Sequence, residues 1–203
     1  MSDGAGTTRL LETLRLVGRA LDDGAQPWAL VGGLAVSVRV EPRFTRDIDL
    51  VVAVTDDRAA EQLVADLTAV GFGLRLTLEQ QALGRLAAVR LLPPGEPEQG
   101  IVVDLLFTSC GIEPQICREA ERIEVVPGLV VPIARSGHLV AMKLLSLSPD
   151  RPQDAADLRG LIRTLTPDER ERALVAVGEI ERVGAHRGKP LSETIRTWLD
   201  AAP

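Results

Sequence analysis

Three aspartates in apolar surroundings are the first candidates for chemistry in this chain. Asp47 and Asp49 stand two residues apart at the start of the apolar run 47–54, and Asp104 is the only charged residue of the run 101–107. Because side chains alternate faces along a strand, Asp47 and Asp49 should point to the same face. Two neighbouring carboxylates repel each other, and Mg²⁺ bound to phosphate oxygens would compensate them, since it takes hard oxygen ligands. The alternative is a solvent-facing strand end with two ordinary acids.

Two adjacent glycines precede these carboxylates by thirteen residues. Gly32 and Gly33 allow positive φ and a close approach of the backbone to a ligand. The helix expected after them would direct its free amides and the positive end of its dipole at an anion, although an ordinary strand-to-helix turn uses the same residues. Together with the carboxylates, the glycines indicate a site for a nucleoside triphosphate with its metals. Arg46 could contact a phosphate or neutralise the carboxylates.

Asp104 should share its strand face with Val102 and Leu106, where an unpaired carboxylate would be costly. We therefore expect Asp104 to be paired, protonated or bound to a metal. In a nucleotidyl transfer it could also accept the proton of the attacking hydroxyl, provided that it lies within hydrogen-bond reach. The alternative is a structural aspartate that caps a turn or pairs with an arginine.

Lys143 is the only charged residue in the apolar run 139–147, and the chain has only two lysines among its 23 basic residues. A helix that is apolar on most sides is largely buried, so this ammonium either reaches the surface or faces a polar site. We favour the site, where the charge would bind a triphosphate. Downstream, Arg151 precedes Asp154 and Asp157, which share one helix face at spacing i, i+3. Asp154 could equally be a first-turn acid that stabilises the start of its helix.

Apolar periodicity and turn residues predict an α+β chain in which a mixed sheet is followed by helices. Ser136 should cap the first helix of the C-terminal part. The expected domains are a core at 1–134, flanked by helices, and a helical region at 135–203 that packs on it. The expected strands are 28–31, 47–54, 72–78, 86–92, 101–107, 123–126 and 129–133, and the expected helices are 8–21, 34–40, 56–70, 138–147, 154–165, 167–183 and 191–199.

Composition narrows the class of protein further. The net charge of −6 over 203 residues argues against a generally basic nucleic-acid binder. Residues 1–134 carry 12 basic and 19 acidic side chains (−7), and residues 135–203 carry 11 and 10 (+1), so a polyanion would bind the C-terminal part. No apolar stretch reaches the roughly 18 residues of a membrane span and the N-terminus lacks a signal pattern, so we expect a cytoplasmic protein without a membrane partner. We interpret Cys110 and Cys117 as free thiols, and His138 and His186 as structural or surface residues.

The arrangement resembles the nucleotidyltransferase superfamily, whose signature is a Gly-Gly or Gly-Ser turn, D-x-D on the next strand and a third acid on a later strand. Its closest branch is the AbiEii-like nucleotidyltransferases of toxin–antitoxin pairs, which add a lysine, an arginine and K-D-x-x-D on helices. Here those residues would be Lys143, Arg151 and Asp154-Ala155-Ala156-Asp157. Gln153 stands where that branch usually has a second lysine, and the gap between Lys143 and Arg151 is longer than usual. The match runs from residue 31 to about residue 162.

The resemblance implies a nucleotidyltransferase-type fold and a metal-dependent transfer of a nucleoside monophosphate from an NTP to a hydroxyl, with release of pyrophosphate. Two Mg²⁺ ions, or Mn²⁺ in their place, would clamp the attacking and leaving oxygens. Asp47 and Asp49 would bind the metals, and Asp104 would bridge one of them and act as the base. The nucleotide would be held by Gly32, Gly33, Arg46, Lys143, Arg151, Asp154 and Asp157.

The resemblance leaves three functions open. The first is transfer to an RNA end such as that of tRNA, by a toxin with a cognate antitoxin protein as partner. The second keeps the chemistry but uses a small antibiotic-like acceptor. The third is a catalytically idle binding partner in a two-component system, which has no physical need for three carboxylates together.

Overall fold

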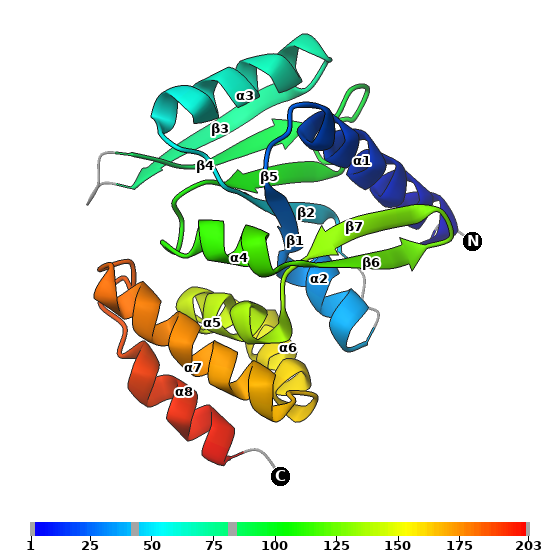
Figure 1. Cartoon of the computed structure of the whole chain (residues 1–203). Helices are drawn as coiled ribbons and strands as arrows, with labels where there is room; N and C mark the ends of the chain where they lie inside the picture. The colour runs from blue at the N-terminus through cyan, green and yellow to red at the C-terminus, as the bar shows by residue number, and fades with distance from the viewer. Residues whose placement is uncertain (1–2, 42–44, 81–84, 202–203) are drawn as a thin grey trace.

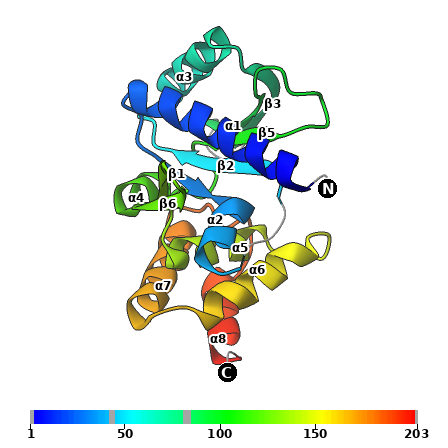
Figure 2. The same ribbon diagram turned by 90° about the vertical axis from the view of Figure 1, so that its right-hand side faces the viewer.

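The computed structural model describes residues 3–41, 45–80 and 85–201, and within them a seven-stranded mixed sheet has helices on both faces (Figure 1, Figure 2). The strands are β1 (Trp28–Val31), β2 (Asp47–Val52), β3 (Gly73–Gln80), β4 (Arg85–Leu92), β5 (Val102–Leu106), β6 (Glu121–Val126) and β7 (Leu129–Ile133). The helices are α1 (Asp3–Asp23), α2 (Gly32–Arg39), α3 (Asp57–Ala69), α4 (Glu113–Glu119), α5 (Ser136–Ser146), α6 (Pro152–Arg163), α7 (Pro167–Arg182) and α8 (Leu191–Asp200).

The strand order β3-β4-β5-β2-β1-β7-β6 places the two acid-bearing strands, β2 and β5, beside each other near the middle of the sheet. These two strands run parallel, and so do β1 and β7, whereas the other neighbouring pairs are antiparallel. The expected α+β class with a mixed sheet is therefore confirmed. All described strands precede residue 134 and α5–α8 follow it, but the division into two domains at that point stays a prediction.

One face of the sheet is covered by α1 and α3 (Figure 1, Figure 2). The apolar residues of β2 and β5 that point to this face, among them Ile48, Leu50 and Leu105, are completely buried. Helix α1 buries Leu10, Leu14, Val17 and Leu21, whose helical spacing makes one apolar stripe. The alternate residues of β2 and β5 must therefore point to the opposite face, and the aspartates are among them.

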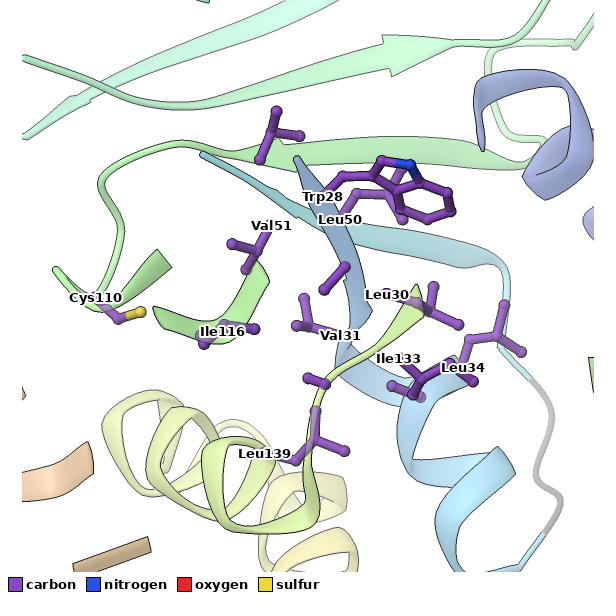
Figure 3. Packing of buried hydrophobic residues seen from close by; sticks show 14 of the residues in the cluster. Trp28, Leu30, Val31, Leu34, Leu50, Val51, Cys110, Ile116, Ile133 and Leu139 are labelled. Carbon is purple, nitrogen blue, oxygen red and sulfur yellow. The ribbon is translucent and has the colours of Figure 1, made fainter. Parts of the chain in front are cut away.

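The opposite face is covered in part by α2, α4 and the C-terminal helices (Figure 2). Figure 3 shows Ile116 of α4 and Leu139 of α5 close to Val31 and Val51 on the central strands, and all four side chains are buried. Because this packing fixes α5 against the middle of the sheet, it also fixes the polar side chains that α5 carries.

A cluster of ion pairs attaches the C-terminal helices to the sheet. Arg172 of α7 binds Glu119 Oε2 at the end of α4 at 2.9 Å, and Arg135, which directly precedes α5, binds Glu121 Oε1 on β6 at 2.6 Å. His138 of α5 is fully buried, with its Nε2 3.8 Å from Glu119 Oε2. Burial lowers the pKa of His138 to about 4, against the opposing effect of Glu119, so this imidazole is neutral near pH 7. The cluster sets the position of α5 relative to the core.

Several features of the fold differ from the sequence-based expectations, and α1 begins at Asp3, five residues earlier than expected. Ser136 is the first residue of α5 and not its N-cap, because Arg135 takes the cap position without a side-chain hydrogen bond. The amide of Gly137 instead donates to Glu169 Oε2 at 2.7 Å, so a tertiary contact replaces the local cap. Helix α2 begins at Gly32 itself, two residues earlier than expected. Helix α4 was not expected, since its seven residues are too few to show an apolar period.

Candidate active site

The carboxylates of Asp49 and Asp104 lie side by side on the face of the sheet that α5 partly covers. Asp49 on β2 pairs in register with Asp104 on the parallel strand β5. Asp47 pairs with Val102 one step earlier along β2 and is exposed. The structure therefore brings two of the three expected acids into one row, with the third at the exposed beginning of β2.

Asp104 is held by an arginine from the next strand. Arg90 on β4 pairs in register with Asp104, and its Nε and NH2 atoms bind the two carboxylate oxygens at 2.8 and 2.7 Å. Pairing with an arginine was the structural alternative considered for Asp104, and the geometry shows that pairing. Arg90 is the only charged residue of the run 86–92, which is the same sequence signal that singles out Asp104. The sequence-based prediction of the site nevertheless did not include Arg90.

The protonation of Asp49 reflects its crowded position. Burial, followed by the neighbouring charges of Asp104 and Asp47, raises its pKa to about 7 against the opposing effects of Lys143 and Arg90. A carboxylate whose negative charge is disfavoured in this way gains from a bound cation.

Gly32 is required by the position of Asp49. Its φ is +65°, and a Cβ atom added to it would lie 1.9 Å from Oδ2 of Asp49. The glycine therefore lets the start of α2 approach the carboxylate closely, while Gly33 is a buried residue of the first turn of the same helix. Of the pair, Gly32 is the residue with a positive φ.

Replacing Gly32 by alanine should destabilise the protein by about 1–3 kcal/mol more than the same change at Gly95, because the new methyl group must displace Asp49. Gly95 is a matched control, since its φ is +74° and a Cβ there would meet nothing within 4 Å. Urea denaturation of both variants measures the difference. Equal losses would show that Asp49 moves aside without cost.

Lys143 is bound by both carboxylates of the downstream helix. Its Nζ lies 2.6 Å from Asp154 Oδ1 and 2.8 Å from Asp157 Oδ2. Asp154 also stands in the first turn of α6, where a negative charge stabilises the start of a helix. This position is compatible both with a role in the site and with a role in stabilising the helix. Gln153, in the place of the second lysine, donates to Asp157 Oδ1 at 3.1 Å. The charge of Lys143 is thus compensated by two acids, and its role towards a triphosphate stays a prediction.

These groups border a cavity of about 510 Å³ between the sheet and helices α5 and α6. Two exposed arginines, Arg151 and Arg187, also line it. Sequence reasoning missed Arg187, which follows α7 and donates from NH2 to the carbonyl of Ser109 at 3.1 Å; no local pattern marks it. The apolar part of the wall includes Leu76, Leu78, Ala88, Leu106, Leu139 and Met142. Of the expected site residues, Gly32, Asp49, Asp104, Lys143, Arg151 and Asp154 line the cavity, whereas Gly33, Arg46, Asp47 and Asp157 do not.

The remaining sequence-predicted polar residues lie elsewhere. Cys110 and Cys117 are free cysteines, the first buried and the second half-buried. Burial raises the pKa of the Cys117 thiol to about 12, so it is not a thiolate near pH 7. His138 is structural, as interpreted, and His186 is half-buried.

The donor set fits a divalent cation that arrives with a nucleotide. Over residues 3–41, 45–80 and 85–201, no three His, Cys, Asp or Glu side chains are placed so that they alone could hold a metal ion. Mg²⁺ usually binds through one or two carboxylates together with substrate phosphates, and the carboxylate row offers that number of oxygen ligands. None of the described helices combines the length and the apolar character needed to cross a membrane.

The fold is that of nucleotidyltransferases of known structure. Similar folds occur in an antigenic nucleotidyltransferase-like protein from Paracoccidioides brasiliensis (20% identity, TM-score 0.53, 97% of this chain and 94% of that chain) and in the antibiotic-resistance factor ANT(2'')-Ia (17% identity, TM-score 0.55, 89% and 95%). A third is a putative nucleotidyltransferase from H. pylori (16% identity, TM-score 0.50, 96% and 92%). At these identities the likeness shows the fold alone.

The chain belongs to the AbiEii family. The family model described as "Nucleotidyl transferase AbiEii toxin, Type IV TA system" matches residues 15–202, nearly the whole chain. No curated protein matches this chain. The resemblance to AbiEii-like nucleotidyltransferases that the sequence motifs indicate is therefore confirmed.

Proposed function

We propose that this nucleotidyltransferase is metal-dependent and transfers a nucleoside monophosphate from an NTP to a hydroxyl of an RNA, as the toxin of a toxin–antitoxin pair. The observation that carries the proposal is the in-register row of Asp49 and Asp104 beside a cavity that also contains Lys143. Family membership supports the toxin role and a cognate antitoxin protein as partner. The cytoplasm, where NTPs and RNA occur together, is the proposed location.

In the proposed reaction, a hydroxyl oxygen of the acceptor attacks the α-phosphorus of the NTP while the bond to the pyrophosphate oxygen breaks. Asp47 and Asp49 would hold Mg²⁺, or Mn²⁺ in its place, together with oxygens of the triphosphate. When bound, the metal ions supply positive charge to the attacking and leaving oxygens. Two ions are expected with the NTP bound, by analogy with other phosphoryl transfers.

The chain's own residues would supply the other steps. Asp104 would accept the proton of the attacking hydroxyl, which requires one of its oxygens to be free of Arg90. Lys143 lines the cavity and would stabilise the negative charge of the triphosphate. Gly32 would place the start of α2 close to the acids, so that amides at this helix end can face phosphate oxygens.

The charge of the cavity wall supports an anionic acceptor. Arg151 and Arg187 are exposed in this wall, and neither has a carboxylate partner among residues 3–41, 45–80 and 85–201. Uncompensated arginines attract phosphate groups, and a cationic antibiotic would be repelled by them. The apolar wall leaves room for the face of a base, which RNA ends present when unpaired.

A small-molecule acceptor remains the second candidate. The cavity of about 510 Å³ is within the size range of small-ligand sites, and the fold is shared with an antibiotic-resistance factor. An uncharged hydroxylated antibiotic would avoid the repulsion by the arginines. A catalytically idle partner is the third candidate, and the complete set of acids opposes it.

A transfer assay separates the three candidates. The protein is incubated with Mg²⁺ and each α-labelled NTP in turn, and total RNA, tRNA or hydroxylated antibiotics are offered as acceptors. We expect the label on RNA, dependence on the metal, and loss of transfer in Asp49→Asn. Label on an antibiotic alone would establish the second candidate, and no transfer to any acceptor would establish the third.

A further inference from the structure

The pairing of Asp104 with Arg90 leaves an unequal distribution of charge across three strands. Arg90 on β4, Asp104 on β5 and Asp49 on β2 follow one another in register. Both oxygens of Asp104 are bound by the guanidinium of Arg90, on the side away from Asp49. Within the described residues, the carboxylate of Asp49 makes no side-chain hydrogen bond or ion pair. Among these residues Arg90 thus pairs with Asp104 alone, and the other cation that acts on Asp49, Lys143, is itself bound by Asp154 and Asp157.

The position of Arg90 allows its guanidinium to separate from the carboxylate of Asp104. The side chain of Arg90 is 44% exposed and lines the cavity, whereas that of Asp104 is only 16% exposed. An exposed guanidinium gives up a bidentate pair at modest cost, because water solvates it well once it is released. Asp104 cannot move away in the same manner, because its strand β5 is paired with a neighbouring strand on both sides.

We propose that Arg90 is the counter-ion of Asp104 in the metal-free protein: it separates from Asp104 when a divalent cation is bound at the carboxylates, and the freed guanidinium then binds a phosphate of the substrate. This inference rests on the proposed metal-dependent function. Displacement gives Asp104 the free oxygen that bridging a metal or accepting a proton requires. The same movement leaves Arg90 in the cavity without an acid, and guanidinium groups bind phosphate through the same two-pronged geometry as carboxylate.

The counter-ion role predicts that removing the positive charge of Arg90 increases the affinity of the protein for a divalent metal ion. Mn²⁺ alone is titrated into nucleotide-free protein, and the electron paramagnetic resonance signal of free Mn²⁺ reports binding. Arg90→Ala should bind Mn²⁺ at least about tenfold more tightly than the wild type, because Asp104 is freed and a repelling charge is lost. Arg90→Lys keeps the positive charge but loses the two-pronged contact of the guanidinium with Asp104. Its affinity for Mn²⁺ should therefore lie between those of the wild type and Arg90→Ala.

Two further variants test whether the gain comes from Asp104. Arg90→Ala combined with Asp104→Asn should lose most of the gain. Arg75→Ala should change nothing, because Arg75 on the neighbouring strand β3 pairs with Glu98 and does not line the cavity. Thermal unfolding of each variant confirms that it is folded, and Arg90→Lys preserves the test if Arg90→Ala does not fold.

The second half of the proposal concerns the loaded site. In the nucleotide-transfer assay, Arg90→Ala should lower kcat/KM for the NTP at least about tenfold at saturating metal, although it binds the metal more tightly. Unchanged or weaker Mn²⁺ binding in Arg90→Ala would overturn the counter-ion role, and unchanged or faster nucleotide transfer would overturn the role in phosphate binding.

If Mn²⁺ binding does not differ between Arg90→Ala and the wild type, while the wild type still transfers nucleotide with Mg²⁺, only this inference fails. If the wild type transfers nothing with any metal, the proposed function fails as well.

Discussion

Replacement of Asp49 by asparagine should lower nucleotide transfer at least about 10³-fold, because it removes the carboxylate proposed to hold the metal with the NTP. Asparagine has nearly the same shape, so packing around β2 should be preserved. Transfer of label from an α-labelled NTP at saturating Mg²⁺ measures the loss. A variant that keeps a tenth of the wild-type rate would exclude Asp49 as a metal ligand.

The same change should increase the stability of the metal-free protein. Folding raises the pKa of Asp49 from 3.8 to about 7, mainly by burial, so its ionised form costs stability above pH 7. This cost shrinks as the pH falls from 7 towards 3.8, the pKa of the unfolded state, and little of it is left near pH 4. At pH 8, Asp49→Asn should therefore be more stable than the wild type, by at most about 4 kcal/mol, with little of the gain left near pH 4.

Asp47→Asn is the matched control for this second effect. Asp47 lies two residues away on the same strand and is exposed, so its removal should change stability by less than about 0.5 kcal/mol. Urea denaturation of the three proteins at pH 8 and near pH 4, in the presence of a chelator, gives the comparison. If Asp49→Asn and Asp47→Asn behave alike at pH 8, the proposed cost of ionising Asp49 is absent.

Replacement of Lys143 by methionine should destabilise the protein by about 3–5 kcal/mol. Methionine fills a similar volume but removes the charge that binds Asp154 at 2.6 Å and Asp157 at 2.8 Å. The side chains of these aspartates are only 10% and 2% exposed, so their charges cannot be solvated by water in the folded state. Urea denaturation at pH 7 measures the loss.

Two comparisons identify the cause of this loss. Lys189→Met replaces the only other lysine, whose Nζ donates to the carbonyls of Leu145 and Leu147, so no carboxylate is left unpaired. Its cost should be about 1–2 kcal/mol. Neutralising both aspartates in the Lys143→Met background should restore most of the stability. A loss below about 1 kcal/mol for Lys143→Met alone would show that water or another group compensates the two acids.

Much of the fold could be predicted because local patterns agree with the tertiary structure. The alternation of apolar and polar residues in β2 and β5 places Ile48 and Leu105 on one face and the aspartates on the other. Helix α4 escaped prediction because a seven-residue helix with a proline near its start has no period to detect. The cap expected at Ser136 failed because Glu169, 32 residues away from Gly137, satisfies that amide.

By itself, the sequence determined which residues can carry chemistry in this protein. A single charge in an apolar run must have a partner, whatever the fold, and this argument singles out Asp104 and Lys143. The motif order also indicated the family, and a match over residues 15–202 confirms it. These conclusions depend only on local spacing and on the cost of burying charge.

Only the tertiary structure decided which partner each charge has. Strand order places Arg90 beside Asp104 and Asp49 on its other side, and these pairings join segments that are far apart in the sequence. Packing of α5 against α6 gives Lys143 two carboxylates instead of an open face. The sequence cannot specify these distances, because register and helix packing are set by the whole core and not by any single segment.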